Sequence, residues 1–284
     1  MPKAAPPADT APPPRPRRAL SYVDSLTPHL FVPSAERPVR AKVRQLAADT
    51  QVMPHSHPWA QVAYCVSGTL HVSVQDLRAG HDTSYVVPPS RAVWIAPRSR
   101  HTVAVLSWAE LHTLYVDPGA APSGWQASRM FAVSPLLREL IVALERVEPG
   151  PREAHLAALT LLELRSAEAA PLGVPLPRAE GGDKRLRALC EAVLHAPAER
   201  ATLADWAGRV GASERTAARL FRDQLGTSYP HWRRQAVLAH ALPLLARGLP
   251  VGQVASACGY ASDSAFSAMV KAQLGQPPSA FQGK

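Results

Sequence analysis

Two histidines stand two residues apart at His55 and His57, Gln61 follows four residues after the second, and His101 lies further along the chain. Imidazole nitrogens bind Zn²⁺, Ni²⁺ and Fe²⁺ well, and three of them leave coordination positions open. Imidazoles also hydrogen-bond small organic ligands. These residues therefore indicate either the metal site of an enzyme or a pocket that senses a small molecule.

The spacing of these residues resembles the two motifs of the cupin family of small β-barrels. The resemblance implies that two histidines of the first motif, His55 and His57, and the histidine that ends the second motif IAPRSRH, His101, are metal ligands. Cupins use a glutamate as a further ligand, and here Gln61 replaces it. A neutral amide is a poor ligand for a hard divalent ion because it brings no charge. Arg98 also stands where a turn glycine is usual.

Three interpretations of the histidines remain open: a site for a divalent metal, a pocket whose histidines hydrogen-bond a small ligand, or a structural role. The residues alone establish no cofactor. Neighbouring aromatic side chains suit a ligand pocket, although such side chains more often belong to a core. The predicted effector pocket comprises His55, His57, Trp59, Gln61, Tyr64, Trp94 and His101.

The segment that carries these residues is typical of short strands. Alternating apolar residues run over 62–66 and again over 70–74, on either side of a Ser-Gly turn at 67–68. This period of two around a glycine turn predicts a hairpin. Further short runs follow between Pro, Gly and Ser residues, which favours an antiparallel barrel or sandwich. We predict a cupin-like sensory domain over residues 29–118.

The pattern changes after Pro118. Leucines recur at helical spacing over 136–144 and 156–164, which predicts two packed helices. Residues 119–180 are therefore interpreted as a helical connector, with a homodimer seam as one use of its leucines. The segment PLGVPLP at 171–177 reads as a linker. Residues 1–28 are rich in proline and arginine and predict a disordered tail.

The last hundred residues carry a helix-turn-helix pattern. Leu203, Trp206, Ala207 and Val210 follow the spacing i, i+3, i+4, i+7, and Gly211 then breaks the helix. The next helix carries its own cap and apolar stripe, namely Ser213 followed by Ala217, Leu220 and Phe221. A small residue in the first helix and a glycine at the turn allow the two helices to cross closely.

The same pattern returns 48 residues later, where Ala255 and Gly259 correspond to Ala207 and Gly211. Two such motifs in register, joined by a helix near 230–247, resemble the AraC/XylS family of bacterial transcription regulators. The resemblance covers about 183–284 and rests on the AxxxG turns, LFRDQLG, the GY turn, AFSAMVKAQLG and PPSAF. Pro243 departs from the family pattern and is expected to kink or divide the joining helix.

The resemblance implies which side chains meet DNA. Arginine can bind guanine O6 and N7 bidentately in the major groove. The second motif has alanine at 268, where the family commonly has arginine, so we expect it to position the protein rather than read bases strongly. Lys271 is its expected phosphate contact, and Arg222 lies nearer the backbone. The predicted DNA-binding residues are Arg215, Thr216, Ala218, Arg219, Arg222, Asp263, Ser264, Ser267 and Lys271.

Composition agrees with a nucleic-acid partner. The 284 residues carry a formal net charge of +9, and residues 181–284 hold 13 Lys and Arg against 7 Asp and Glu, so most of the excess lies there. The three cysteines are scattered without CxxC spacing, which is typical of reduced thiols. No run of about 18 apolar residues occurs, so we expect a cytoplasmic protein without a membrane partner.

The sequence therefore predicts an α+β protein: an N-terminal cupin-like antiparallel β-barrel, a helical connector, and a C-terminal all-α domain over 181–284 with two helix-turn-helix motifs. The predicted function is a sequence-specific transcription regulator that responds to a small-molecule effector and controls a neighbouring transporter or metabolic gene. Expected partners are double-stranded DNA, the effector, a second copy of the chain, and RNA polymerase if the protein activates. The prediction is that the chain is not an enzyme.

Two alternatives remain. One is a metal-dependent cupin enzyme, a dioxygenase or isomerase, with a DNA-binding appendage. The other is a constitutive DNA-binding protein whose barrel only dimerises.

Overall fold

The structure is a computed structural model that describes residues 21–25, 28–76, 80–89, 91–105, 108–170, 172–178 and 180–282. Residues 1–20 of the predicted tail lie outside the described residues. The described part of that tail differs from the prediction, because β1 (Ser21–Val23) pairs in parallel with β3 (Thr50–His55). A short 3₁₀ turn, η1 (Pro28–Phe31), then leads into the sheets.

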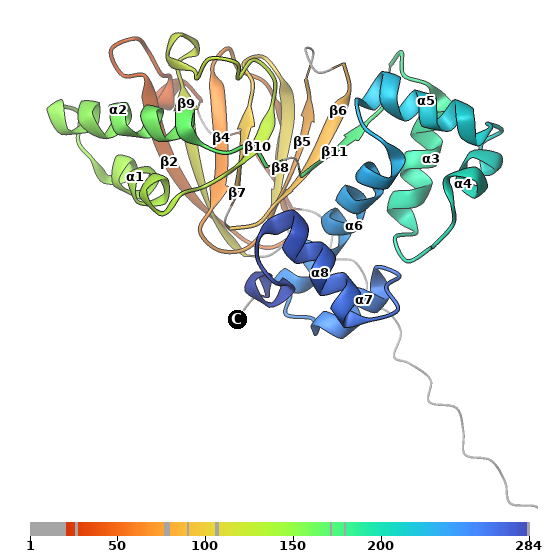
Figure 1. The fold of residues 1–284 in the computed structure, drawn as a ribbon. Coiled ribbons are helices and arrows are strands. Elements are labelled where there is room, and N and C mark those ends of the chain that lie inside the picture. The colour runs from red at the N-terminus through yellow and green to blue at the C-terminus, as the bar shows by residue number, and fades with distance from the viewer. Residues whose placement is uncertain are drawn as a thin grey trace, which may run out of the picture.

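The strands form two sheets that face each other (Figure 1). The six-stranded sheet has the order β1, β3, β8 (Arg100–Val105), β5 (Leu70–Gln75), β6 (Asp82–Val87) and β11 (Gly173–Leu176). The five-stranded sheet has the order β10 (Arg129–Ala132), β7 (Arg91–Ile95), β4 (Ala60–Cys65), β9 (Ala109–Val116) and β2 (Val39–Leu46). The arrangement is an open form of the predicted antiparallel barrel, within the predicted α+β class.

Strand β4 is buried on both faces. Because side chains alternate across a strand, Ala63 and Cys65 point into the core between the two sheets, while Val62 and Tyr64 point to the outer face. Helices α1 (Pro135–Arg146) and α2 (Pro151–Ser166) cover that outer face and confirm the two predicted connector helices.

The region predicted as connector also contributes strands. β10 pairs with β7, and β11 pairs with β6, so the barrel extends well past the predicted boundary at 118. The predicted linker at 171–177 was therefore wrong for 173–176. Proline is tolerated on an edge strand because the missing N–H can lie on the unpaired side, and Pro175 lies in such a strand opposite Thr83.

The C-terminal unit is all-α, as predicted. Its helices are α3 (Lys184–His195), α4 (Leu203–Arg209), α5 (Glu214–Leu225), α6 (Tyr229–Ala246), α7 (Val251–Ala257) and α8 (Asp263–Leu274), followed by η3 (Pro278–Phe281). Ser213 and Ser262 cap α5 and α8 by accepting hydrogen bonds from backbone N–H groups three residues later. α6 runs through Pro243 without a break, so the expected division of the joining helix does not occur.

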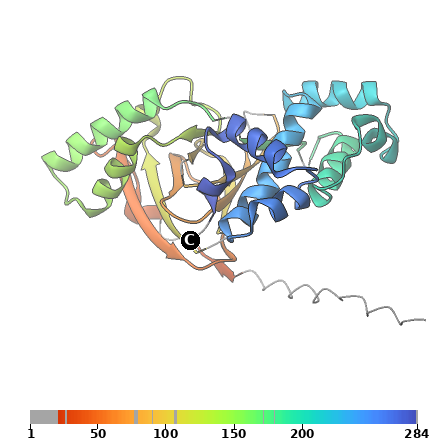
Figure 2. The same ribbon diagram turned by 60° about the horizontal axis from the view of Figure 1, so that its bottom comes forward.

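The two parts of the molecule pack directly on one another. Figures 1 and 2 show α6 running from the first helix pair to the second beside the six-stranded sheet. The indole Nε1 of Trp232 in α6 donates to the Pro175 carbonyl of β11 at 2.7 Å, and Arg91 of β7 donates to the Leu274 carbonyl at the end of α8 at 3.0 Å. Within the described ranges, no helix has the length and hydropathy needed to cross a membrane.

Candidate functional site

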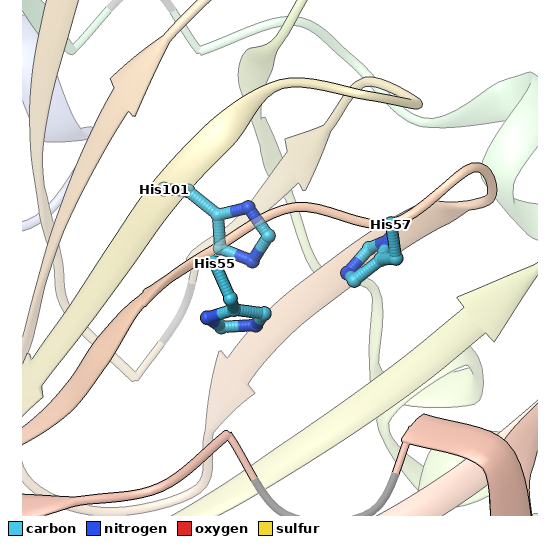
Figure 3. A group of neighbouring side chains, drawn as sticks. All are labelled: His55, His57 and His101. Atoms are coloured by element: carbon cyan, nitrogen blue, oxygen red, sulfur yellow. The ribbon is translucent and has the colours of Figure 1, made fainter.

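The structure brings His55, His57 and His101 together at one end of the sheets (Figure 3). His55 ends β3 and lies opposite His101 of β8 in the strand register, and His57 follows in the loop before β4. One nitrogen of each ring lies within 4.8 Å of the corresponding atoms of the other two. Three imidazoles from two distant segments of the chain therefore converge on one point.

Backbone carbonyls orient all three rings. The Nδ1 atoms of His55, His57 and His101 lie 2.8, 2.8 and 2.9 Å from the carbonyl oxygens of Met53, Trp59 and Ser99. A carbonyl oxygen only accepts, so these contacts place the proton on each Nδ1. Each Nε2 is then unprotonated and carries a lone pair. This is how histidines are held when they bind metals through Nε2.

The Gln61 side chain lies between two of these lone pairs. Its amide is 3.0 Å from His57 Nε2 and 3.1 Å from His101 Nε2, through the atom placed as Oε1. With both Nδ1 atoms protonated, each Nε2 must accept a hydrogen bond. A half-turn of the amide presents its NH₂ group, which has one N–H for each ring. The hydrogen-bond requirements therefore favour that orientation, and two N–H donors then lie where a cation would bind.

The cluster is kept uncharged by burial. His101 is 1% exposed, and burial, together with the neighbouring His55, lowers the pKa of its imidazole to about 3. Burial also lowers the pKa of His57 and of His55. All three rings are therefore neutral near pH 7, which is the state that coordinates metals.

Little free space adjoins the histidines. A cavity of about 20 Å³ is lined by residues that include His55, Gln61 and the basic side chains Lys42 and Arg44. That volume holds a water and is too small for an organic effector. A larger cleft of about 530 Å³ lies outside, at the mouth of the sheets, and is lined by residues that include Arg98 and Ser99.

Arg98 has a left-handed backbone with φ of 64°, which explains why glycine is usual at this position. Its N–H donates to the His57 carbonyl at 2.8 Å and ties the turn to the cluster.

Two predicted pocket residues do not join the histidines. Tyr64 and Trp94 point to the outer face of the five-stranded sheet, toward α1 and Trp125, and therefore lie away from the histidine cluster. Tyr64 stands three residues after Gln61 in the same strand, so the two side chains point to opposite faces. The sequence alone could have indicated this difference. Trp59 does reach the cluster, stacking on His57 at 5.1 Å between ring centroids.

Sequence reasoning missed Tyr115 of β9, whose ring packs edge-on against His57 at 5.5 Å. No local motif marks it, because strand pairing alone places it opposite Gln61.

In the first helix-turn-helix, α5 separates into two faces. Ala217, Leu220 and Phe221 are buried, whereas Arg215, Arg219 and Arg222 are exposed, and Thr216 and Ala218 are partly exposed. Arg219 pairs with Asp223 at 3.2 Å in an exposed contact, which stabilises little and leaves the guanidinium free to turn.

In the second motif, Phe266, Val270 and Leu274 of α8 are buried. Asp263, Ser264 and Lys271 are exposed and Ser267 is partly exposed. This outward face holds one cation and one carboxylate, whereas α5 exposes three arginines together with Glu214 and Asp223.

A further basic cleft was not anticipated. It has a volume of about 390 Å³ and is lined by residues that include Arg200, Arg233 and Arg234 beside the turn glycine Gly259. The paired arginines at 233–234 in the joining helix are the sequence signal that could have indicated it.

Comparisons with known proteins agree with these two regions. Residues 43–205 match the model of the AraC-like ligand binding domain, and residues 206–284 match that of a helix-turn-helix domain. The chain is 32% identical over 233 residues to the HTH-type transcriptional regulator NimR of Escherichia coli, covering 80% of this chain and 81% of that protein. It is 30% identical over 107 residues to the HTH-type transcriptional regulator RipA of Corynebacterium glutamicum, covering 38% of this chain and 31% of RipA.

Among solved structures, ToxT from Vibrio cholerae is similar at 13% identity with a TM-score of 0.36, covering 86% of this chain and 97% of that chain. That similarity is too low to establish a shared arrangement of the whole molecule. The matches to both domain models and to NimR decide the family. The chain belongs to the AraC family of transcription regulators, with an N-terminal ligand-binding domain and a C-terminal helix-turn-helix domain.

Proposed function

We propose that this protein reads a specific operator by placing α5 and α8 in successive major grooves, and that its N-terminal domain reports an effector to them. The observation that carries the proposal is the repeat of one helix-turn-helix in register, each with a capped second helix and an exposed polar face. Two recognition helices on one connecting helix suit two adjacent grooves.

The two helices differ in their proposed roles. On α5, Arg215 and Arg219 contact base edges, with Thr216 and Ala218 beside them, and Arg222 contacts the backbone. On α8, Lys271 neutralises a phosphate. The side chains that approach the groove there are short, namely Asp263, Ser264 and Ser267. The three exposed arginines of α5, against none on α8, support this division.

Footprinting of the full-length protein on the DNA that flanks its own gene tests the proposal. A protected stretch spanning two adjacent major grooves is expected, with no protection on scrambled duplex of equal length. Repeating the footprint with candidate metabolites and metal salts identifies the effector by the change in protection. Equal binding to both duplexes would contradict sequence-specific regulation. A protein that regulates a neighbouring transporter or metabolic gene from the cytoplasm would protect the promoter of that gene.

We also infer that the histidine cluster holds a divalent transition metal as effector or structural ion. Two observations support the fit: the Nδ1 atoms bonded to carbonyls and the convergence of the three rings. Binding requires the Gln61 amide to turn its N–H groups away from the two Nε2 atoms, so that its oxygen faces the ion. A bound ion would supply positive charge and open coordination positions. The chain's own residues would hold it, and the ion would join β3, β8 and the loop before β4.

Titration of the chelator-treated protein with Zn²⁺ and Ni²⁺ tests this inference. Saturable binding of one ion is expected, and His101→Ala should weaken it by roughly 10-fold or more, since one of three ligands is lost. His155→Ala is the matched control, because His155 is exposed on α2. Equal binding by both variants would rule out the cluster. The alternative of a cupin enzyme would in addition require turnover by the metal-loaded protein.

A second copy of the chain is a further proposed partner. Leu136 on α1 and Leu159 and Leu162 on α2 are 53%, 46% and 54% exposed, on the side away from the sheet. We infer that these leucines form a homodimer seam, since apolar side chains gathered on an exposed face favour association. Sedimentation of the protein should show a dimer that Leu159→Glu with Leu162→Glu dissociates. A monomer at micromolar concentration would contradict the seam.

A further inference from the structure

A cleft of about 490 Å³ lies between the sensory and DNA-binding parts, away from the histidine cluster. One wall comes from the sheets, and includes Thr83 and Tyr85 of β6 and Arg129 and Met130 of β10. The other wall comes from the turn after α5 and from α6, and includes Thr227, His231, Trp232 and Gln235. The volume is in the range of pockets that bind small organic molecules.

Gln235 is an unusual residue in this wall. Its side chain is 2% exposed, and among the described residues its Oε1 has no hydrogen-bond partner. Its Nε2 lies 3.3 Å from His231 Nε2. Turning the amide would only transfer the deficit from one atom to the other. A buried polar atom without a partner destabilises the fold, so its retention beside a cleft points to a ligand that satisfies the amide.

Arg129 supplies a second unmet group. Its Nη2 donates to the Gly124 carbonyl at 2.8 Å and its guanidinium lies over the Trp125 ring, but its buried Nε has no partner among the described residues. No Asp or Glu occurs among the described residues that line the cleft. The buried carboxylate of Asp76 lies just behind the lining, where it accepts from the Ser128 N–H at 2.6 Å. Within the cleft itself, the unpartnered Arg129 Nε is the group that suits an anion.

The rest of the lining is apolar or small. Met130, Ala170 and Trp232 are buried, and Pro175 lies beside them. The Tyr85 hydroxyl donates its proton to the Ser128 carbonyl at 3.0 Å, so that proton is not available to a ligand. A ligand here would meet an apolar surface with two polar contacts, which defines a compact apolar body with one acidic group.

We propose that this interdomain cleft is a second effector site, which takes a small organic acid with an aromatic or alicyclic body. The carboxylate accepts from Arg129 Nε and from the Gln235 amide N–H, and the apolar body lies against Met130 and Trp232. This requires the Gln235 amide turned by half a turn, so that its Oε1 accepts from a His231 N–H and its NH₂ group faces the ligand. Because the ligand contacts both the sheets and α6, it binds one relative placement of the two parts better than another. Such a difference in affinity is what couples a site to the DNA-binding helices. Only this coupling rests on the function proposed above; the binding does not.

Calorimetry of the full-length protein with benzoate, 2-naphthoate and cyclohexanecarboxylate tests the site. A chelator in the buffer prevents a metal at the histidines from binding the acids. Saturable binding of at least one acid is expected. Gln235→Leu should weaken it by about tenfold, the equivalent of one hydrogen bond to a charged group. Ala170→Trp should abolish it by filling the cleft, and Gln253→Leu, the same change on the exposed face of α7, should leave it unchanged.

Arg129→Met tests the acidic group. It should weaken the acid by about tenfold and leave the neutral analogue 2-naphthalenemethanol unaffected. No saturable binding by any of the three acids, or equal binding by Gln235→Leu and the parent protein, overturns the proposal.

Operator affinity measured with and without the bound acid then tests the coupling. An unchanged affinity overturns the coupling claim. Failure to bind any operator would contradict the function proposed above, and the calorimetry would still decide the cleft.

Discussion

Gln61 shows how one side chain defines a site. An amide that bridges two buried, neutral imidazoles satisfies both lone pairs without an ion. A carboxylate at the same position could not donate to them, and the rings would then require a cation or a proton. The residue at 61 therefore governs how strongly the cluster attracts a metal.

Gln61→Glu is predicted to tighten Zn²⁺ binding by about 10- to 100-fold near pH 7, since the substitution adds a charged ligand and removes the competing N–H donors. Competition with a chelator of known affinity measures the change. Gln61→Leu, which removes the donors but adds no charge, is the comparison. Equal affinities in all three proteins would place residue 61 outside the coordination sphere.

Arg219→Ala is predicted to cost roughly 1–3 kcal/mol in operator affinity and to relax preference at one base pair, because a bidentate contact to guanine is lost. Fluorescence anisotropy on the footprinted operator and on single-base variants measures both effects. Arg165→Ala, on the exposed end of α2, is the control. An equal loss on specific and random DNA would show that Arg219 contacts only phosphate.

Burial raises the pKa of the Cys65 thiol to about 12. The thiol of the unfolded chain ionises near pH 9 while the folded one stays protonated, so the unfolded state binds fewer protons between these values. The free energy of unfolding is therefore predicted to fall as pH rises from about 9 to 12, by about 1.4 kcal/mol per pH unit from this thiol. Urea unfolding at several pH values should show a shallower decline for Cys65→Ala.

At the scale of elements, the two helix-turn-helix motifs depend on their turn glycines in different ways. Gly211 and Gly259 have φ of 70° and 78°. A Cβ at Gly211 would meet no described atom within 4 Å, whereas one at Gly259 would lie 2.3 Å from the Ala198 carbonyl oxygen. The second turn is thus packed against the loop before α4, and the first is not.

Gly211→Ala is predicted to destabilise the protein by about 1–2 kcal/mol, the cost of a left-handed backbone. Gly259→Ala should cost about 3 kcal/mol or more, because the loop carrying Ala198 must also move. Urea unfolding of both variants gives the comparison. An equal decrease in the free energy of unfolding in both variants would show that the loop carrying Ala198 moves away without destabilising the protein.

At the scale of the whole molecule, the positive charge is carried mainly by the DNA-binding part. Operator binding by the full-length protein is predicted to weaken steeply with salt, with a slope of log affinity against log salt of about −4 or steeper, since counterions leave the neutralised phosphates. Lys271→Ala should reduce the slope by about 1. Arg152→Ala on α2 should leave it unchanged. Binding that is insensitive to salt would contradict the proposed interface.

The sequence by itself determined the parts that depend on short-range patterns. The stripe at Leu203, Trp206 and Ala207, with its repeat 48 residues later, predicted both helix-turn-helix motifs, because helical periodicity acts within a few residues. The cluster of His55, His57 and His101 was predicted from the resemblance to the two cupin motifs, whose spacing along the chain reflects the spacing of the strands.

Tertiary structure alone decided what depends on long-range pairing. Tyr64 and Trp94 lie away from the histidines and Tyr115 lies against them, because strand register determines which face a side chain occupies. The segment 173–176 is an edge strand because it pairs with the backbone of β6, a contact that its own sequence does not indicate. The interdomain cleft joins Arg129 and Gln235, which are more than one hundred residues apart, and no local pattern could bring them together.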